Sequence, residues 1–107
     1  MILVIGQALA KPDTLQAMLS NSVEHVERSR AEPGCISHEV STDAQVPLQL
    51  TFVERWSDMD ALRAHFRVEA SRAFAKALAA MADGAPRMSV YQSDEVDLAG
   101  LLAGRPQ

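Results

Sequence analysis

The stretch LQLTFVERWSDMDALRAHF, residues 48–66, predicts a strand, a tight corner and a helix in that order. Successive side chains of a strand point to opposite faces, so every second residue shares one face. In the first half of the stretch, one such face consists of Leu48, Leu50, Phe52, Glu54 and Trp56. Because this face is mostly apolar, we expect it to lie against a hydrophobic core.

The second half of the same stretch predicts a helix that covers this face. Ser57 is placed to cap the first turn, and Asp60, three residues later, completes a weak capping box. Met59, Leu62 and Phe66 then follow at helical spacing. The corner therefore turns one apolar face onto another, and the rest of the chain is expected to build around it.

Size and composition predict one small globular domain. The 107 residues are 48% hydrophobic and 22% charged, with a formal net charge of −4. No cluster of Lys and Arg could follow a phosphate backbone, so no nucleic-acid partner is expected. The single cysteine, Cys35, excludes an internal disulfide and fits a reducing compartment. No apolar run approaches the roughly 20 residues of a membrane helix, so we expect a cytoplasmic protein without membrane contact.

The remaining apolar periodicity alternates between strand and helix patterns. It predicts a strand at residues 2–10, a helix at 13–31, strands at 35–42 and 48–56, a helical region at 59–82 and a strand at 87–92. The strand at 2–10 is a better explanation of MILVIGQALA than a signal peptide, which needs a basic start and a longer apolar region. A bend is expected near residues 67–69, because Val68 does not continue the stripe before it.

Two elements carry histidines whose placement follows from periodicity. The first helix has an inner stripe of Leu15, Met18, Leu19, Ser22, Val23 and Val26, with His25 at its flank. On the strand at 35–42, Ile36, His38 and Val40 share one face, and Cys35 lies on the other. His38 is therefore expected to be buried.

The order of elements, βαββαβ, predicts an α+β protein with a ferredoxin-like fold, in which two helices cover one face of a four-stranded antiparallel sheet. The opposite face also carries apolar residues, among them Leu3, Ile5 and Val53. An exposed apolar sheet face is a liability, and pairing with a second copy of the chain is the simplest cover. We therefore expect a homodimer, with residues 1–93 as the domain and 94–107 as a C-terminal tail.

Several segments resemble the antibiotic biosynthesis monooxygenase family. They are AEPGC at residues 31–35, ERW at 54–56, ALRAHF at 61–66, Phe74, and the pair Val90 and Tyr91. The resemblance covers residues 2 to about 93 and implies a dimeric α+β barrel with a pocket between sheet and helices. It also implies activities such as cofactor-independent oxygenation of hydroquinone-like compounds, quinol oxidation, haem degradation or isomerase-type proton transfer.

The same resemblance bears on cofactors. Haem-degrading relatives use a histidine and a tryptophan on the helix, and counting from Trp56 those positions hold Ala75 and His65 here. They also use an asparagine in the first strand, where this chain has only Gln7. Haem is therefore disfavoured and no cofactor is expected. Ala70 stands where many relatives carry a second helix histidine, which argues against a mechanism that needs both.

The expected activity is oxygenation of a small aromatic or quinol-type substrate without a cofactor. A base would remove a phenolic proton, and the phenolate would pass an electron to O₂. The catalytic candidates are His65 and His38, although His65 could also be a surface or capping histidine and His38 a hydrogen-bonded core histidine. The candidates for substrate binding are Trp56, Glu54, Phe52, Phe66 and Tyr91, with a structural hydrogen-bonding role favoured for Glu54.

Other chemistries find little support in the sequence. Cys35 and His38 are three apart on a strand, so they are expected to point to opposite faces and not to form a nucleophile–base pair. His25, His38 and His65 are scattered and lack the spacing of metal ligands, so no metal site is expected. Two alternatives to oxygenation remain open: a non-catalytic, stress-associated or ligand-binding homodimer, and an isomerase that uses His65 alone.

Overall fold

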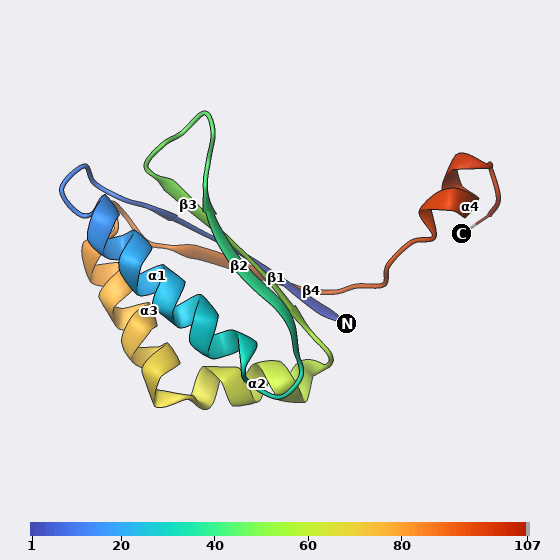
Figure 1. Cartoon of the computed structure of the whole chain (residues 1–107), viewed down its shortest axis with the longest axis horizontal. Coiled ribbons are helices and arrows are strands. Elements are labelled where there is room, and N and C mark those ends of the chain that lie inside the picture. Colours follow the sequence, from blue (N-terminus) through green and yellow to red (C-terminus); the bar gives the residue numbers. More distant parts are fainter. Residues whose placement is uncertain (107) are drawn as a thin grey trace.

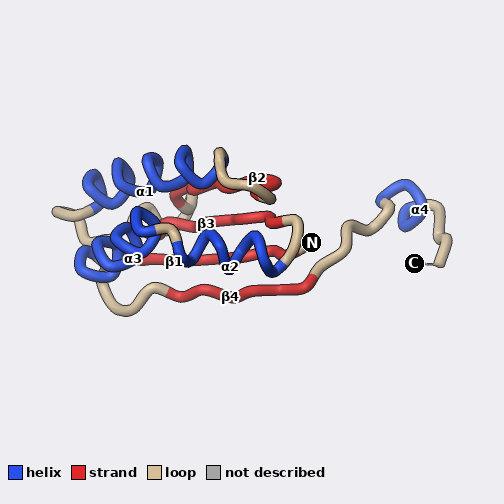
Figure 2. The backbone as a smooth tube through the Cα atoms, turned by 90° about the horizontal axis from the view of Figure 1, so that it is seen from below, coloured by secondary structure: helices blue, strands red, loops and turns tan. Residues whose placement is uncertain are grey.

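The computed structural model describes residues 1–106. Its elements are β1 (Ile2–Leu9), α1 (Leu15–Arg30), β2 (Cys35–Thr42), β3 (Gln49–Trp56), α2 (Met59–Arg67), α3 (Glu69–Met81), β4 (Arg87–Gln92) and α4 (Leu98–Leu102). The strands form one antiparallel sheet in the order β2-β3-β1-β4. Helices α1, α2 and α3 all lie on one face of this sheet (Figures 1 and 2). The predicted ferredoxin-like α+β fold is confirmed.

The face of the sheet beneath the helices carries two neighbouring hydrophobic clusters. One is built around Met18, Leu50, Phe52 and Leu78, and the other around Ile2, Val4, Trp56 and Leu62. β3 contributes to both, because its alternate residues from Leu50 to Trp56 are all buried. The alternation predicted for residues 48–56 is therefore correct, and it links the two clusters along a single strand.

The corner between β3 and α2 is capped one residue later than expected. Asp58, not Ser57, is the N-cap of α2, and its Oδ1 accepts a hydrogen bond from the Ala61 backbone N–H at 2.8 Å. Ser57 instead donates its backbone N–H to the Gly34 carbonyl, at 2.8 Å, and the helix begins only at Met59. The Ser57 cap was therefore a wrong prediction.

Gly34 brings the loop before β2 into close contact with the start of α2. Its φ of +82° lies in the left-handed region, where an L side chain is strained. A Cβ added to Gly34 would also lie only 2.5 Å from the Cβ of Ala61. The glycine thus permits both the turn of the loop and its approach to α2.

α1 is rotated relative to the predicted stripe. Its buried residues lie on one helical face, because each is three or four positions from another member of the set: they are Met18, Ser22, His25, Val26 and Ser29. Val23 is 46% exposed, so its assignment to the inner face was wrong, as was the placement of His25 at the flank. The Ser29 hydroxyl donates a hydrogen bond to the His25 backbone carbonyl at 2.7 Å, so this buried serine is paired within the helix.

β2 contains an irregularity that changes the faces of its first residues. The register shifts between Cys35 and Ser37, so that Cys35 pairs with Trp56 and His38 pairs with Glu54. Residues opposite each other share a face, which places Cys35 and His38 on the helix-covered side together. The prediction that these two residues point to opposite faces was wrong, because Ile36 is an extra, exposed residue in the strand.

The helical region after β3 breaks at Val68, as expected. Val68 has an extended backbone conformation, with ψ of 124°, and separates α2 from α3. The two helices consequently run in different directions over the sheet (Figure 1). This break lets α2 and α3 cover different parts of the same face and leaves space between them and the sheet.

The chain after β4 leaves the domain. Residues 93–97 belong to no helix or strand and lead to α4, which stands apart from the sheet (Figures 1 and 2). Leu98, Leu101 and Leu102 are all exposed there. The predicted tail thus contains a short helix, and its last residue, 107, lies outside the described residues. Among residues 1–106, no helix has the length and apolar character needed to span a membrane.

Candidate active site

A cavity of about 280 Å³ lies between the sheet and the helices α2 and α3. Its lining is predominantly apolar and includes Phe52, Phe66, Phe74, Leu78 and Met88. This volume is close to the lower end of the range of ligand pockets and suits a small molecule of one or two rings. His25, Glu54 and His65 supply polar groups to the same wall.

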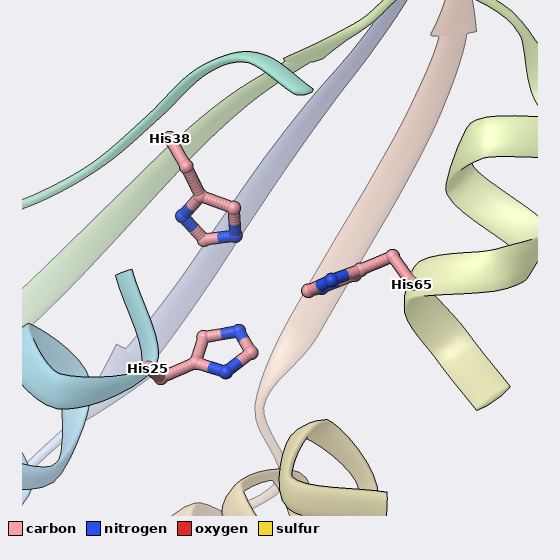
Figure 3. A group of neighbouring side chains, drawn as sticks. All are labelled: His25, His38 and His65. Carbon is pink, nitrogen blue, oxygen red and sulfur yellow. The ribbon is translucent and has the colours of Figure 1, made fainter. Parts of the chain in front are cut away.

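Three histidines from three different elements meet at this wall. His25 comes from α1, His38 from β2 and His65 from α2, and their rings point toward one another (Figure 3). One nitrogen from each ring lies within 4.8 Å of the other two. The side chains are almost fully buried, since the residues are 5%, 0% and 3% exposed. The expectation of scattered histidines was therefore wrong, because distance along the chain does not report distance between elements.

Glu54, on β3, lies next to His38 and His65. Its Oε1 accepts a hydrogen bond from Trp56 Nε1 at 2.9 Å, and lies 3.3 Å from His38 Nε2 and 3.9 Å from His65 Nε2. Burial alone raises the pKa of the Glu54 carboxyl, but His38, Trp56 and His65 outweigh that effect and lower it. Glu54 is thus a buried carboxylate with a structural hydrogen bond, as the sequence suggested.

Glu32, in the loop between α1 and β2, orients His65. Its Oε1 lies 2.9 Å from Nδ1 of His65, which therefore carries the proton of that hydrogen bond. In the neutral ring, Nε2 is left with its lone pair and lies 3.9 Å from Glu54 Oε1. A carboxylate that fixes the tautomer of a histidine in this way is a recurring arrangement at sites where the second nitrogen is a base or a metal ligand.

His25 and His38 have polar atoms without partners. Among the described residues, Nδ1 of His25 and both ring nitrogens of His38 have no aligned hydrogen bond. The ring of His25 stacks on Phe74 at a centroid distance of 4.1 Å. Burial, followed by the proximity of His38 and His65, lowers the pKa of His25 to about 3, so this ring is neutral at pH 7.

The sequence-based candidates fall into three groups. Phe52, Glu54, His65 and Phe66 line the cavity. Trp56 and His38 lie behind its wall, with the Trp56 ring 4.7 Å from the His65 ring. Tyr91 is 48% exposed and pairs with Leu3 on the opposite face of the sheet, so it does not line this cavity.

Two residues of the site were missed by sequence reasoning, His25 and Glu32. His25 lies three residues from Ser22 and four from Ser29, and this spacing could have placed it on the inner face. Glu32 belongs to the AEPGC segment, but no local pattern in the sequence links it to a histidine 33 positions later.

Comparison with known proteins identifies the family. Residues 1–77 match the family model described as antibiotic biosynthesis monooxygenase. The chain belongs to the antibiotic biosynthesis monooxygenase family. This match spans well over half of the chain and includes His25, His38 and His65, as well as β1–β3, α1 and α2.

Solved structures with this fold support the assignment to the antibiotic biosynthesis monooxygenase family. A crystal structure of an antibiotic biosynthesis monooxygenase is 26% identical, with a TM-score of 0.82, and the alignment covers 89% of this chain and all of that chain. A protein from Methanosarcina mazei is 25% identical, with a TM-score of 0.83, over 87% of this chain and 92% of that chain.

A curated relative is longer than the present chain. An uncharacterized protein of Synechocystis is 36% identical over 66 residues, which is 62% of this chain and 45% of that protein. The chain therefore matches less than half the length of this relative.

The family model confirms the resemblance to the antibiotic biosynthesis monooxygenase family that the sequence showed. One of the similar solved structures is also named as an antibiotic biosynthesis monooxygenase.

Proposed function

We propose that this protein oxygenates a small phenolic or hydroquinone-type compound held in the cavity beneath α2 and α3. The observation that carries the proposal is the hydrogen-bonded pair of His65 and Glu32, in which the buried His65 lines the cavity and the partly buried Glu32 supports it from the loop before β2. A histidine with one nitrogen held by a carboxylate and the other directed inward has the arrangement of a general base. The apolar walls favour an aromatic ligand, and the family assignment favours monooxygenation.

In the proposed reaction, Nε2 of His65 takes the phenolic proton, and Glu32 stabilises the resulting imidazolium. The phenolate passes one electron to O₂, and the radical pair combines at a ring carbon next to the phenolate. His65 returns the proton to the peroxide, and loss of water leaves a carbonyl group. The sum is hydroquinone plus O₂ giving hydroxyquinone plus water. One oxygen atom enters the ring, the other leaves as water, and no external reductant is needed.

Oxygen uptake with a panel of hydroquinones tests this reaction. We expect the wild-type protein to incorporate one atom of isotopically labelled O₂ into the product. His65→Ala removes the base and is expected to lower the rate by about 100-fold or more, with a smaller loss for Glu32→Gln.

Arg63→Ala is the matched control, because Arg63 is on α2 like His65 but its side chain is exposed. Its rate should equal that of the wild type. The absence of oxygen uptake with every hydroquinone would contradict the proposal, as would a His65→Ala variant that keeps the wild-type rate.

We also propose that the face of the sheet without helices pairs with a second copy of the chain. Ile5, Leu9 and Tyr91 are exposed apolar residues on this face, and burying them in a homodimer would remove them from water. Sedimentation at micromolar concentration should give the mass of a dimer, and Ile5→Glu should give a monomer. A wild-type protein that sediments as a folded monomer would contradict this proposal.

A further inference from the structure

We propose that His25, His38 and His65 bind a divalent transition-metal ion, with Glu54 as the fourth donor. This inference goes beyond the proposed oxygenation and does not rest on it. Metal coordination at Nε2 of His65 would occupy the lone pair that the proposed base uses. Metal binding and proton transfer are therefore alternative states of the same nitrogen, and each can be measured without the other.

The distances are close to those of a tetrahedral site. Zinc–nitrogen bonds of about 2.0–2.1 Å place neighbouring donor atoms roughly 3.4 Å apart. Glu54 Oε1 is already 3.3 Å from His38 Nε2 and 3.9 Å from His65 Nε2. The histidine nitrogens all lie within 4.8 Å of one another, so the widest pair has to close by about 1.4 Å. Rotations of the imidazole rings toward the centre of the cluster can supply this change.

The unpartnered nitrogens supply an independent reason to expect a ligand. A buried polar atom without a hydrogen bond costs about 1–3 kcal/mol. Nδ1 of His25 and Nδ1 of His38 are in this state among the described residues, and Nε2 of His38 has only the 3.3 Å contact with Glu54 Oε1, which is not an aligned hydrogen bond. They lie in one small cluster, and the rings face a common centre (Figure 3). A metal ion at that centre would satisfy one nitrogen of each ring together.

The surroundings of the cluster also match those of metal sites. Metal-bound histidines usually donate their second ring N–H to a carboxylate or a carbonyl group, which fixes the tautomer. His65 does so through Nδ1, which faces Glu32 at 2.9 Å. Trp56 Nε1 likewise holds the Glu54 carboxylate in position from behind. Both donors thus have their orientation set by residues that are not themselves ligands.

The donor set selects the class of metal. Three imidazoles and one carboxylate suit zinc, copper, iron or nickel, whereas calcium and magnesium prefer sites made of oxygen ligands. The cluster also forms part of the cavity wall through His25, Glu54 and His65. A metal ion there would be adjacent to any small molecule in the cavity.

The test is metal binding by the full chain after treatment with a chelator, in the absence of substrate. Calorimetric titration with Zn²⁺ should give one site per chain. Titration with Co²⁺ should give the visible absorption bands of a four-coordinate nitrogen and oxygen site. His25→Ala and His38→Ala should each weaken Zn²⁺ binding by at least about 100-fold, and Glu32→Gln by 10–100-fold.

Two controls separate this site from others. Cys35→Ser should leave the affinity unchanged, because Cys35 is the one thiol of the chain and a competing ligand. X-ray absorption of the wild-type Zn²⁺ complex should show histidine ligands and no sulfur, a readout that needs no variant to fold. Failure to bind one Zn²⁺ per chain would overturn the proposal. Binding that survives both histidine substitutions would do the same, as would sulfur in the coordination shell.

Discussion

The two ends of the layer between sheet and helices are built from the same elements but differ in character. At one end, α1 and β3 contribute Met18 and Leu50 to an apolar cluster with little polar surface. At the other end, the same helix and strand contribute His25 and Glu54 to a buried polar cluster, which lies beside the second apolar cluster. Both ends are shielded from water to a similar degree, so burial alone does not distinguish them.

The two ends therefore differ in what they contribute to the free energy of unfolding. Burial of apolar side chains stabilises the protein, whereas buried histidines with unpartnered nitrogens reduce its stability. Such groups are uncommon in native cores unless they bind a ligand or take part in a reaction. The histidine end is therefore the part of the layer for which we propose a function, and the apolar end stabilises the fold that holds it in place.

The largest effect is expected at the apolar end. Leu50→Ala removes a side chain that is fully buried and should lower the free energy of unfolding by about 2–5 kcal/mol. Leu102→Ala, in the exposed α4, should change it by less than about 0.5 kcal/mol. Urea unfolding followed by circular dichroism measures both. Equal stabilities for the two variants would contradict the assignment of this end as the stabilising one.

The buried His25 should make the protein less stable as the pH is lowered. The pKa of His25 is about 3 in the folded protein, against a usual value of 6.5. Below pH 6.5 the unfolded chain therefore binds a proton that the folded chain excludes, and stability falls as the pH is lowered. His25→Leu should make the loss of stability between pH 6.5 and pH 5 shallower.

The measurement is urea unfolding of the metal-free protein at several pH values in this range. It stays above the range in which the Glu54 carboxyl, whose pKa is lowered, takes up a proton. Parallel stability profiles for the wild type and His25→Leu would show that His25 is not the group responsible.

A smaller effect is expected within the histidine end, at the hydrogen bond between Trp56 and Glu54. Trp56→Phe keeps an aromatic ring in the core but removes the Nε1–H donor to Glu54, and should cost roughly 1–3 kcal/mol. In a double-mutant cycle with Glu54→Gln, the two losses should be non-additive because the residues share one hydrogen bond. Additive losses would mean that the Trp56–Glu54 contact contributes little.

The smallest effect is expected at the helix that carries His65. Asp58→Ala removes the N-cap of α2 and should cost about 1 kcal/mol, with faster hydrogen exchange in α2. Ser57→Ala should cost much less, because the Ser57 side chain does not cap the helix. An equal effect of the two substitutions would contradict the capping geometry described here.

Much of the fold followed from the sequence because its periodicities are local. The alternation from Leu50 to Trp56 and the break at Val68 depend only on neighbouring residues, and both are confirmed. The family resemblance also followed from short segments of this kind. These features made His65 a catalytic candidate from the sequence alone.

The site was harder to predict because it depends on contacts between distant segments. An offset of a few residues in the expected helical stripe moved His25 to the flank of α1, away from the other histidines. The strand irregularity at Cys35 and Ser37 has no marker in the sequence, so the side on which Cys35 lies was inverted. Glu32 and His65 are 33 residues apart, and only the folded chain brings them together.

Because of the irregularity in β2, the two edge strands of the sheet differ in how regular their backbone pairing is. β2 and β4 are the outer strands, and the extra residue Ile36 interrupts the regular ladder of β2. Bulges of this kind discourage an additional strand from joining a sheet. β4 is regular and exposed along all six of its residues. Growth of the sheet by a further strand, from this chain or another, is therefore expected beside β4 and not beside β2.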